Sequence, residues 1–114
     1  MEKLQLIARF AVHPGKLESF NTVMTTCIER VREKEPGNLQ YDWFYNADAS
    51  VYKVCETYAN PDAVFAHMEN VGPYLGQLLA LSDFSGEIYG NPPEALIKAL
   101  ADFEVSYYAF AAGT

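Results

Sequence analysis

The order in which strand-like and helix-like patterns follow one another constrains the fold of this chain more than any other feature. Residues 4–12 alternate apolar and polar side chains at first and then become mostly apolar, as a strand does. Between Leu17 and Val31, apolar side chains recur every three or four residues, which predicts one amphipathic helix. The segment Glu35-Pro36-Gly37-Asn38 ends this helix, because proline cannot continue it and glycine permits the chain to reverse.

The following segments complete a β-α-β-β-α-β order. Residues 39–45 and 51–58 predict two strands that form a hairpin, since turn-forming residues separate them. Asn60-Pro61-Asp62 predicts the start of a second helix, which we expect Val71-Gly72-Pro73 to interrupt before a further helical stretch. Residues 84–89 predict a fourth strand. This order is typical of an α+β, ferredoxin-like domain, with four antiparallel strands and two helices on one face.

We therefore expect one domain over residues 1–114, with a core at about 4–90 and a C-terminal extension at 91–114. In the extension, residues 94–101 predict a short helix and 104–110 a fifth strand, which could extend the sheet of either subunit. Trp43 points to one face of the second strand and Phe44 to the other, so neither face of the sheet is cleanly hydrophilic. The simplest cover for the second face is another copy of the chain, which predicts a homodimer through the sheet face, a dimeric α+β barrel.

The charge distribution argues against several classes of partner. The formal net charge is −7, and the few clustered cations at residues 30–34 are interleaved with glutamates. Nucleic acids and anionic membranes attract clustered cations, so we expect neither as a partner. The first residues lack the basic start and apolar stretch of a signal peptide, and no window approaches a membrane span, so we expect a cytoplasmic protein. Cys27 and Cys55 fall in apolar patterns and are expected to be buried thiols rather than a disulfide.

Most kinds of cofactor site have no support in the sequence. His13 and His67 are the only histidines, and neither has a Cys, Asp or Glu at a recognised metal-ligand spacing. A glycine-rich loop between a strand and a helix, which would bind the phosphates of a nucleotide or flavin, is also missing. We therefore expect a protein that works without a metal or a cofactor.

One group of polar residues could carry chemistry, at the corner where the third predicted strand leads into the second helix. Glu56 and Tyr58 share a strand face, Asn60 begins the helix, and His67 lies on the same side of the helix as Ala63. A histidine in this position could act as a base or as a hydrogen-bond donor near neutral pH. The alternative is a structural histidine whose hydrogen bonds are satisfied at the surface or at an interface.

The same stretch, from Glu56 to His67, resembles the central signature of the antibiotic biosynthesis monooxygenase family. That signature is a Glu, an aromatic residue two positions later, an Ala at the start of a helix, and a His four residues beyond it. Residues 12–16 resemble the family's strand-Pro-Gly-helix entry, residues 35–42 its Glu-Pro-Gly turn, and residues 84–90 its last core strand. The resemblance covers residues 4–90 and leaves the C-terminal extension outside it.

The resemblance implies a ferredoxin-like subunit that dimerises through its sheet and has a pocket between sheet and helices. Known members include enzymes that oxygenate quinols and polycyclic phenols with O2 and use no metal, flavin or other prosthetic group, so the resemblance implies that no cofactor is needed. By match to the motif, His67 is the candidate base or donor, Tyr58 holds the aromatic position, which is often Trp in the family, and Glu56 orients a partner. The strand pattern adds Trp43 and Phe44 as pocket walls, and Asn60 is a further pocket candidate.

The sequence is also consistent with two other functions. The chain could be a non-catalytic dimeric module that binds a small hydrophobic ligand, because a fold does not fix a function. It could also bind or degrade haem, since the family includes haem-degrading enzymes. Haem degradation would need a Trp beside the axial histidine, and Tyr58 stands in that position.

Overall fold

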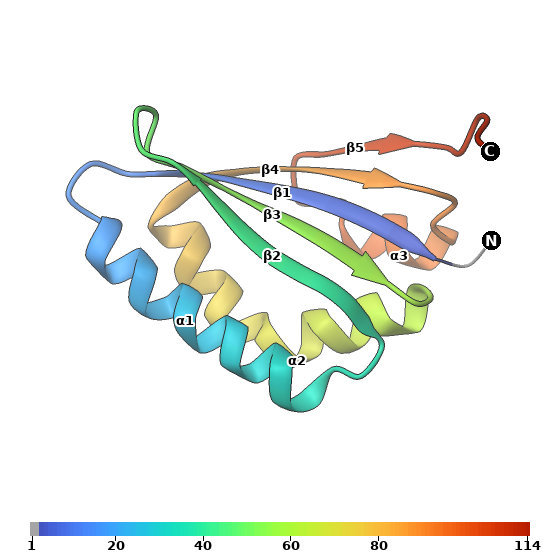
Figure 1. The fold of residues 1–114 in the computed structure, drawn as a ribbon, viewed down its shortest axis with the longest axis horizontal. Coiled ribbons are helices and arrows are strands. Elements are labelled where there is room, and N and C mark those ends of the chain that lie inside the picture. Colours follow the sequence, from blue (N-terminus) through green and yellow to red (C-terminus); the bar gives the residue numbers. More distant parts are fainter. Residues whose placement is uncertain (1–2) are drawn as a thin grey trace.

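The computed structural model describes residues 3–114, so the first two residues of the expected domain lie outside the described part. Its elements, in chain order, are β1 (Leu4–Val12), α1 (Leu17–Lys34), β2 (Asn38–Asn46), β3 (Val51–Tyr58), α2 (Pro61–Ala80), β4 (Ser82–Tyr89), α3 (Glu94–Ala99) and β5 (Val105–Tyr108) (Figure 1). This order confirms the predicted ferredoxin-like α+β fold. The observed strands begin and end within two residues of the positions that the apolar pattern predicted.

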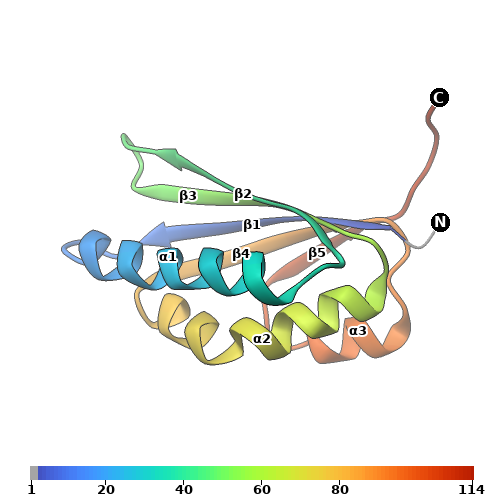
Figure 2. The same cartoon turned by 60° about the horizontal axis from the view of Figure 1, so that its bottom comes forward.

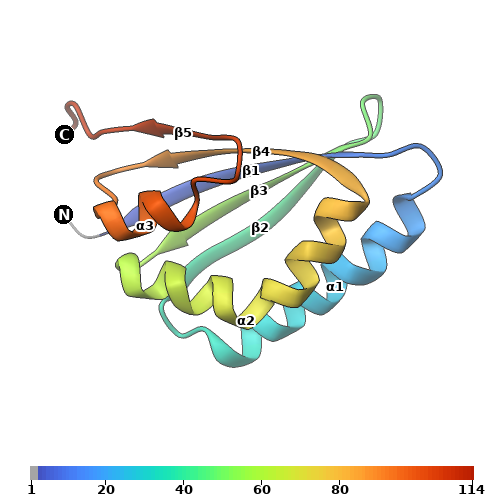
Figure 3. The same ribbon diagram turned by 180° about the vertical axis from the view of Figure 1, so that it is seen from behind.

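The sheet is open and mixed, with the strand order β2-β3-β1-β4-β5. The first four strands pair in an antiparallel manner, and β5 runs parallel to β4 at the edge. The C-terminal strand therefore extends the sheet of its own chain. Figures 2 and 3 show the helices on one side of the sheet, and no element of residues 3–114 covers the other side.

The second helix is continuous, so the predicted interruption at Val71-Gly72-Pro73 is wrong. Pro73 lies inside α2, which runs from residue 61 to residue 80. Proline removes one backbone hydrogen bond, but α2 buries Val71 and Leu78 to 2% exposure on either side of it. Burying each of these side chains contributes about 1.5–3 kcal/mol, which is enough to hold the helix across the proline.

The core lies between the sheet and the helices and has an aromatic centre. The ring of Phe10 in β1 stacks on Trp43 in β2 at 5.6 Å between centroids, and Phe20 in α1 stacks on Tyr52 in β3 at 5.2 Å. A second cluster, around Leu4 and Tyr58, fills the other end of the sheet beneath α3. The alternation of side chains along a strand determines which residues join the core, because every second residue of β1 and β3 faces the helices.

The opposite face of the sheet carries a mixture of polar and apolar side chains. Arg9 and Lys53 are exposed there, Ile7 and Cys55 are half-buried, and Phe44 is 58% exposed. Cys27 lies in the core, and both cysteines are free thiols. None of the helices within residues 3–114 combines the length and apolarity needed to span a membrane.

The turn between α1 and β2 is pressed directly against the start of α2, and this contact yields a prediction. A Cβ at Gly37 would lie 2.9 Å from the Cβ of Ala63, and neither atom can rotate away. We expect Gly37→Ala to lower the free energy of unfolding by about 1–3 kcal/mol, the usual cost of overpacking.

Gly76→Ala is the matched control, because nothing lies within 4 Å of a Cβ there. It sits in the exposed part of α2, so alanine should raise the free energy of unfolding by about 0.5–1 kcal/mol. Urea denaturation of both variants measures the difference. A Gly37→Ala variant as stable as the wild type would contradict the close contact between the turn and α2.

Candidate active site

Four polar side chains meet at one end of the space between the sheet and the helices. Glu35 caps the C-terminal end of α1, Glu56 and Tyr58 lie on the helix-facing side of β3, and His67 lies on α2. The fold brings them together because β3 leads directly into α2, while the turn after α1 packs beside the start of α2.

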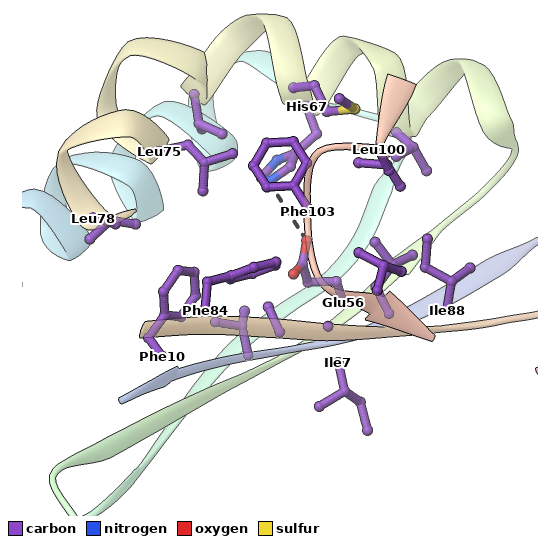
Figure 4. A pocket seen from close by; sticks show the side chains of 18 of the residues that line it. Ile7, Phe10, Glu56, His67, Leu75, Leu78, Phe84, Ile88, Leu100 and Phe103 are labelled. Atoms are coloured by element: carbon purple, nitrogen blue, oxygen red, sulfur yellow. Dashed lines mark ion pairs between the residues drawn. The ribbon is translucent and has the colours of Figure 1, made fainter. Parts of the chain in front are cut away.

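The imidazole of His67 lies between two buried carboxyl groups. Its Nδ1 is 2.9 Å from Oε1 and 3.1 Å from Oε2 of Glu35. Its Nε2 is 3.6 Å from Oε1 of Glu56 on the other side (Figure 4). The side chain of His67 is only 13% exposed, so the ring faces the interior of the molecule.

Glu35 accepts hydrogen bonds from two further donors besides His67. Asn70 Nδ2 donates to its Oε2 at 2.7 Å, and Asn38 Nδ2 donates to its Oε1 at 3.2 Å. Burial alone would raise the pKa of Glu35, but the hydrogen bonds from His67, Asn70 and Asn38 outweigh it and hold the pKa below the ordinary 4.5. Glu35 is therefore an acceptor, which places the proton of a neutral His67 on Nδ1 and leaves the Nε2 lone pair free.

Glu56 has the opposite character, although it lies close to the same histidine. Burial raises the pKa of this carboxyl, more than the nearby His67 and the hydrogen bond from Tyr58 lower it. The hydroxyl of Tyr58 donates to Oε1 of Glu56, and its own pKa is also raised by burial, so Tyr58 stays a neutral phenol. His67 is thus flanked by one carboxyl that favours the ionised form and one that favours the protonated form.

Two of these polar side chains, Glu56 and His67, border a cavity of about 90 Å³ whose lining is otherwise largely apolar (Figure 4). Its apolar walls include Phe10 and Phe84 from the sheet and Leu75 from α2. Tyr41 and Trp43 of β2 complete the lining, and the ring of Tyr41 meets that of His67 edge-on at 5.2 Å. Trp43 Nε1 is buried and has no hydrogen-bond partner within residues 3–114, so the cavity lining includes an unused donor.

The structure separates the predicted site residues into two groups. Glu56, His67 and Trp43 line the cavity, and Tyr58 lies directly behind Glu56 as its donor. The other two lie elsewhere. Phe44 points to the open face of the sheet, because it is one residue out of step with Trp43. Asn60 uses its side chain to cap α2, where it accepts from Ala63 N at 2.9 Å.

Sequence reasoning missed Glu35 as a site residue and missed the wall formed by the C-terminal extension, at residues 100, 103 and 105. Glu35 belongs to no apolar pattern, and the sequence indicates it only as part of the turn that ends a helix. One signal was available. A carboxylate at the C-terminal end of a helix is disfavoured by the helix dipole, so its presence there calls for a compensating partner.

The site offers little to a metal ion or a large cofactor. Within residues 3–114, no group of three or more His, Cys, Asp or Glu side chains has a geometry that could hold a metal. A cavity of about 90 Å³ is also far smaller than the ~300–1,000 Å³ of pockets for drug-sized ligands, and a porphyrin is larger still. The arrangement is suited to moving a proton to or from a small aromatic or aliphatic molecule.

Solved structures of other proteins share this fold. MupZ from Pseudomonas fluorescens is 18% identical with a TM-score of 0.84, over 100% of this chain and 94% of that one. SnoaB, a cofactor-independent oxygenase from Streptomyces nogalater solved as a mutant, is 20% identical with a TM-score of 0.67, over 82% and 96%. Rv0793 from Mycobacterium tuberculosis is 23% identical with a TM-score of 0.70, over 82% and 98%.

At these identities the solved structures show the fold alone. No curated protein sequence matches the chain at a significant level. The family model of antibiotic biosynthesis monooxygenases, however, matches residues 4–72, a segment that includes Glu35, Glu56, Tyr58 and His67. Because this match covers more than half of the sequence, the chain belongs to the antibiotic biosynthesis monooxygenase family.

Proposed function

We propose that this protein is a cofactor-independent monooxygenase that oxidises an aromatic quinol or a related polycyclic phenol with O2. The observation that carries the proposal is the position of His67, held by the Glu35 carboxylate with Nε2 at the border of a largely apolar cavity. Membership of the family supports monooxygenase chemistry in general. The substrate class follows from what this site can do to a phenol.

The reaction needs a base, because the substrate itself must supply the electrons. His67 Nε2 takes the proton of the phenol hydroxyl, and Nδ1–H stays bonded to Glu35, which stabilises the imidazolium that forms. The phenolate is a stronger reductant than the phenol and can pass electrons to O2. The overall change is balanced: a quinol with a free ring carbon and O2 give a hydroxyquinone and water, and a phenol with a free para carbon gives a para-quinone and water in the same way. In both cases one oxygen atom enters the ring, the other leaves as water, and four electrons move from the substrate to oxygen.

The surroundings of His67 favour an anion that is shielded from water. The unpaired Nε1–H of Trp43 is a donor in the cavity lining and can bind the oxygen that carries the developing charge. Burial raises the pKa of the Glu56 carboxyl, so this group can donate to the same oxygen whenever it carries a proton. Tyr41 remains a neutral phenol, because burial raises its pKa well above the ordinary 10. A small apolar cavity also keeps water away from the carbanion-like intermediate, which would otherwise be protonated.

A second candidate function is a proton transfer without oxygen, as in an isomerase. It is favoured by one observation: an acid, Glu56, lies 3.6 Å from the free nitrogen of a base, His67. Such a pair can remove a proton from one carbon and return it to another, and it needs no oxidant. Oxygen consumption separates the two functions.

We also propose that the protein works as a homodimer through the open face of the sheet. That face exposes Phe44 beside the cations Arg9 and Lys53, while Glu87 and Glu104 lie toward the β4–β5 edge. Two copies related by a two-fold axis could therefore set the cations of one against the carboxylates of the other. The sheet would then be covered on both sides, as its mixed composition suggests.

Oxygen uptake tests the proposed activity and the role of His67. Metal-stripped protein is incubated with hydroquinones, naphthoquinols and anthrones, and O2 is followed with an electrode. We expect saturable uptake that survives chelators, and His67→Ala should lower it by about 10²–10⁴-fold. The matched control is His13→Ala, which removes an exposed histidine paired with Asp83 and should leave the rate unchanged.

The same assay includes Glu35→Gln, which keeps the shape of the side chain. The amide can donate to Nδ1 and move the histidine proton to Nε2, so kcat should fall by about tenfold or more while KM changes little. Equal uptake by the wild type and His67→Ala would remove His67 from the mechanism. Product formation without oxygen consumption would favour the isomerase-like function instead.

The raised pKa of Glu56 gives a prediction about stability and pH. The folded chain holds this proton more tightly than the unfolded chain, so above the ordinary pKa of 4.5 the native state loses stability as pH rises. Gln cannot ionise but can still accept from Tyr58. The stability of Glu56→Gln relative to wild type should therefore increase with pH, by at most ~1.4 kcal/mol per pH unit.

Urea denaturation at several values between pH 4.5 and pH 8 measures this difference. Glu94→Gln is the control, because this carboxylate is 81% exposed on α3 and its replacement leaves the buried site unchanged. If the free energy of unfolding of Glu56→Gln falls relative to that of the wild type as pH rises, Glu56 is ionised in the folded protein and the prediction is wrong.

The oligomeric state is measured by sedimentation velocity. We expect a species of twice the 12.8 kDa chain mass, and Phe44→Lys should shift it toward the single chain by placing an ammonium group on the open face. Ile97→Lys is the control, because Ile97 is 40% exposed on α3 at the helix side of the molecule. A wild-type protein that sediments as a single chain at micromolar concentration would contradict the dimer.

A further inference from the structure

The C-terminal extension closes one side of the candidate cavity. After β4 the chain forms α3 and returns as β5, and residues 100–104 connect the two. Leu100 and Phe103 of this connection and Val105 of β5 line the cavity, and Figure 4 shows Leu100 and Phe103 around the same cavity as His67 and Glu56. The other walls belong to the antiparallel strands, to α2 and to Cys27 of α1. The extension is therefore the one part of the lining that comes from outside the core sheet and the two long helices.

Phe103 is the largest side chain that the extension contributes to the cavity. Its ring meets Phe84 edge-on at 6.0 Å, and Phe84 in turn lies 5.2 Å from Phe10. The aromatic core thus continues across the cavity to the extension. The backbone around Phe103 is held mainly by local bonds, such as Phe103 N to Leu100 O at 3.0 Å, while Glu104 O accepts from Gly86 N at 2.9 Å.

The size of the cavity limits what can enter it. About 90 Å³ is less than the ~150 Å³ of an apolar cavity that admits benzene. A single substituted ring would therefore need a small outward movement of one wall, whereas two or three fused rings would need a whole side chain to leave. Strand pairing on one side and the packing of α2 on the other hold the remaining walls in place. Phe103 lies on a short connection beside a four-residue edge strand, so it is the lining side chain that can move outward.

We propose that Phe103 is the residue that determines substrate size: it admits phenols of one ring and excludes fused two-ring and three-ring phenols from His67. The proposal rests on the proposed function for the chemical class of the ligand and narrows that class to single-ring quinols. Removing the ring of Phe103 frees a space of about the size of one benzene ring next to the cavity. A variant without this ring should therefore bind larger phenols than the wild type does.

Calorimetric titration without oxygen tests this inference on the whole chain. The ligands are 4-methoxyphenol, 1-naphthol and 9-phenanthrol, which have one, two and three rings. We expect the wild type to bind the one-ring phenol at least about tenfold more tightly than the three-ring phenol. Phe103→Ala should improve binding of 9-phenanthrol by about tenfold or more and change binding of 4-methoxyphenol by less than about threefold.

Two further variants test whether the effect depends on the size and the position of the side chain. Phe103→Leu keeps an apolar side chain of intermediate size, so it should give an intermediate gain, and it serves where Phe103→Ala fails to fold by circular dichroism. Phe110→Ala is the matched control, because Phe110 is a C-terminal phenylalanine that is 58% exposed and does not line this cavity. It should leave all three affinities unchanged.

The possible failures are distinguishable. Equal binding of one-ring and three-ring phenols by the wild type would overturn the inference, and so would an equal change for all three ligands in Phe103→Ala. Failure of every protein to bind any phenol would overturn both the inference and the proposed ligand class. Size discrimination that depends on Phe103, together with no oxygen uptake, would support the inference and contradict only the oxygenase.

Discussion

The buried Glu35 carboxylate is the group on which the arrangement of this site depends. An ionised carboxylate in the interior costs several kcal/mol unless donors replace the water it has lost. Here the donors come from His67, Asn70 and Asn38, so the same hydrogen bonds that stabilise the charge also join the end of α1, the start of β2 and the middle of α2. Arg30 adds a bond from its Nε to the backbone oxygen of Asn70. The corner of the fold and the orientation of the histidine are thus fixed by one network.

The second carboxyl of the site shows how strongly the environment decides the role of a side chain. Glu56 is as buried as Glu35, at 7% exposure, but its hydrogen-bond donor is a single tyrosine hydroxyl. One donor cannot replace full hydration, so burial raises the pKa of Glu56, whereas the three donors to Glu35 lower the pKa of that group. The result is a histidine with an acceptor on one ring nitrogen and an acid near the other. Such a polarised pair is more useful for moving protons than two equal carboxylates would be.

The sequence predicted the fold well because each strand and helix leaves a local pattern of apolar residues. The predictions were wrong or incomplete where the arrangement of a residue depends on its surroundings in the folded chain. Pro73 suggested a broken helix, but the burial of residues on either side of it keeps α2 whole. The strand pattern predicted Phe44 as a pocket wall together with Trp43, but strand alternation turns Phe44 to the open face. The only signal from Glu35 was its unfavourable position at the end of a helix. That signal could not identify its three partners, because they are distributed along the sequence and meet Glu35 only in the folded chain.

The chemistry and the shape of the cavity come from different parts of the chain. Glu35, Glu56 and His67 all lie within residues 4–72, which match the family model, whereas Phe84 and Phe103 lie beyond that match. A change in the later segment can therefore alter which molecule reaches His67 without disturbing the hydrogen bonds that orient the ring. Because β5 is a short edge strand, the extension can vary in position at little cost to the antiparallel core. Such a division would let proteins with the same acid–base centre act on substrates of different size.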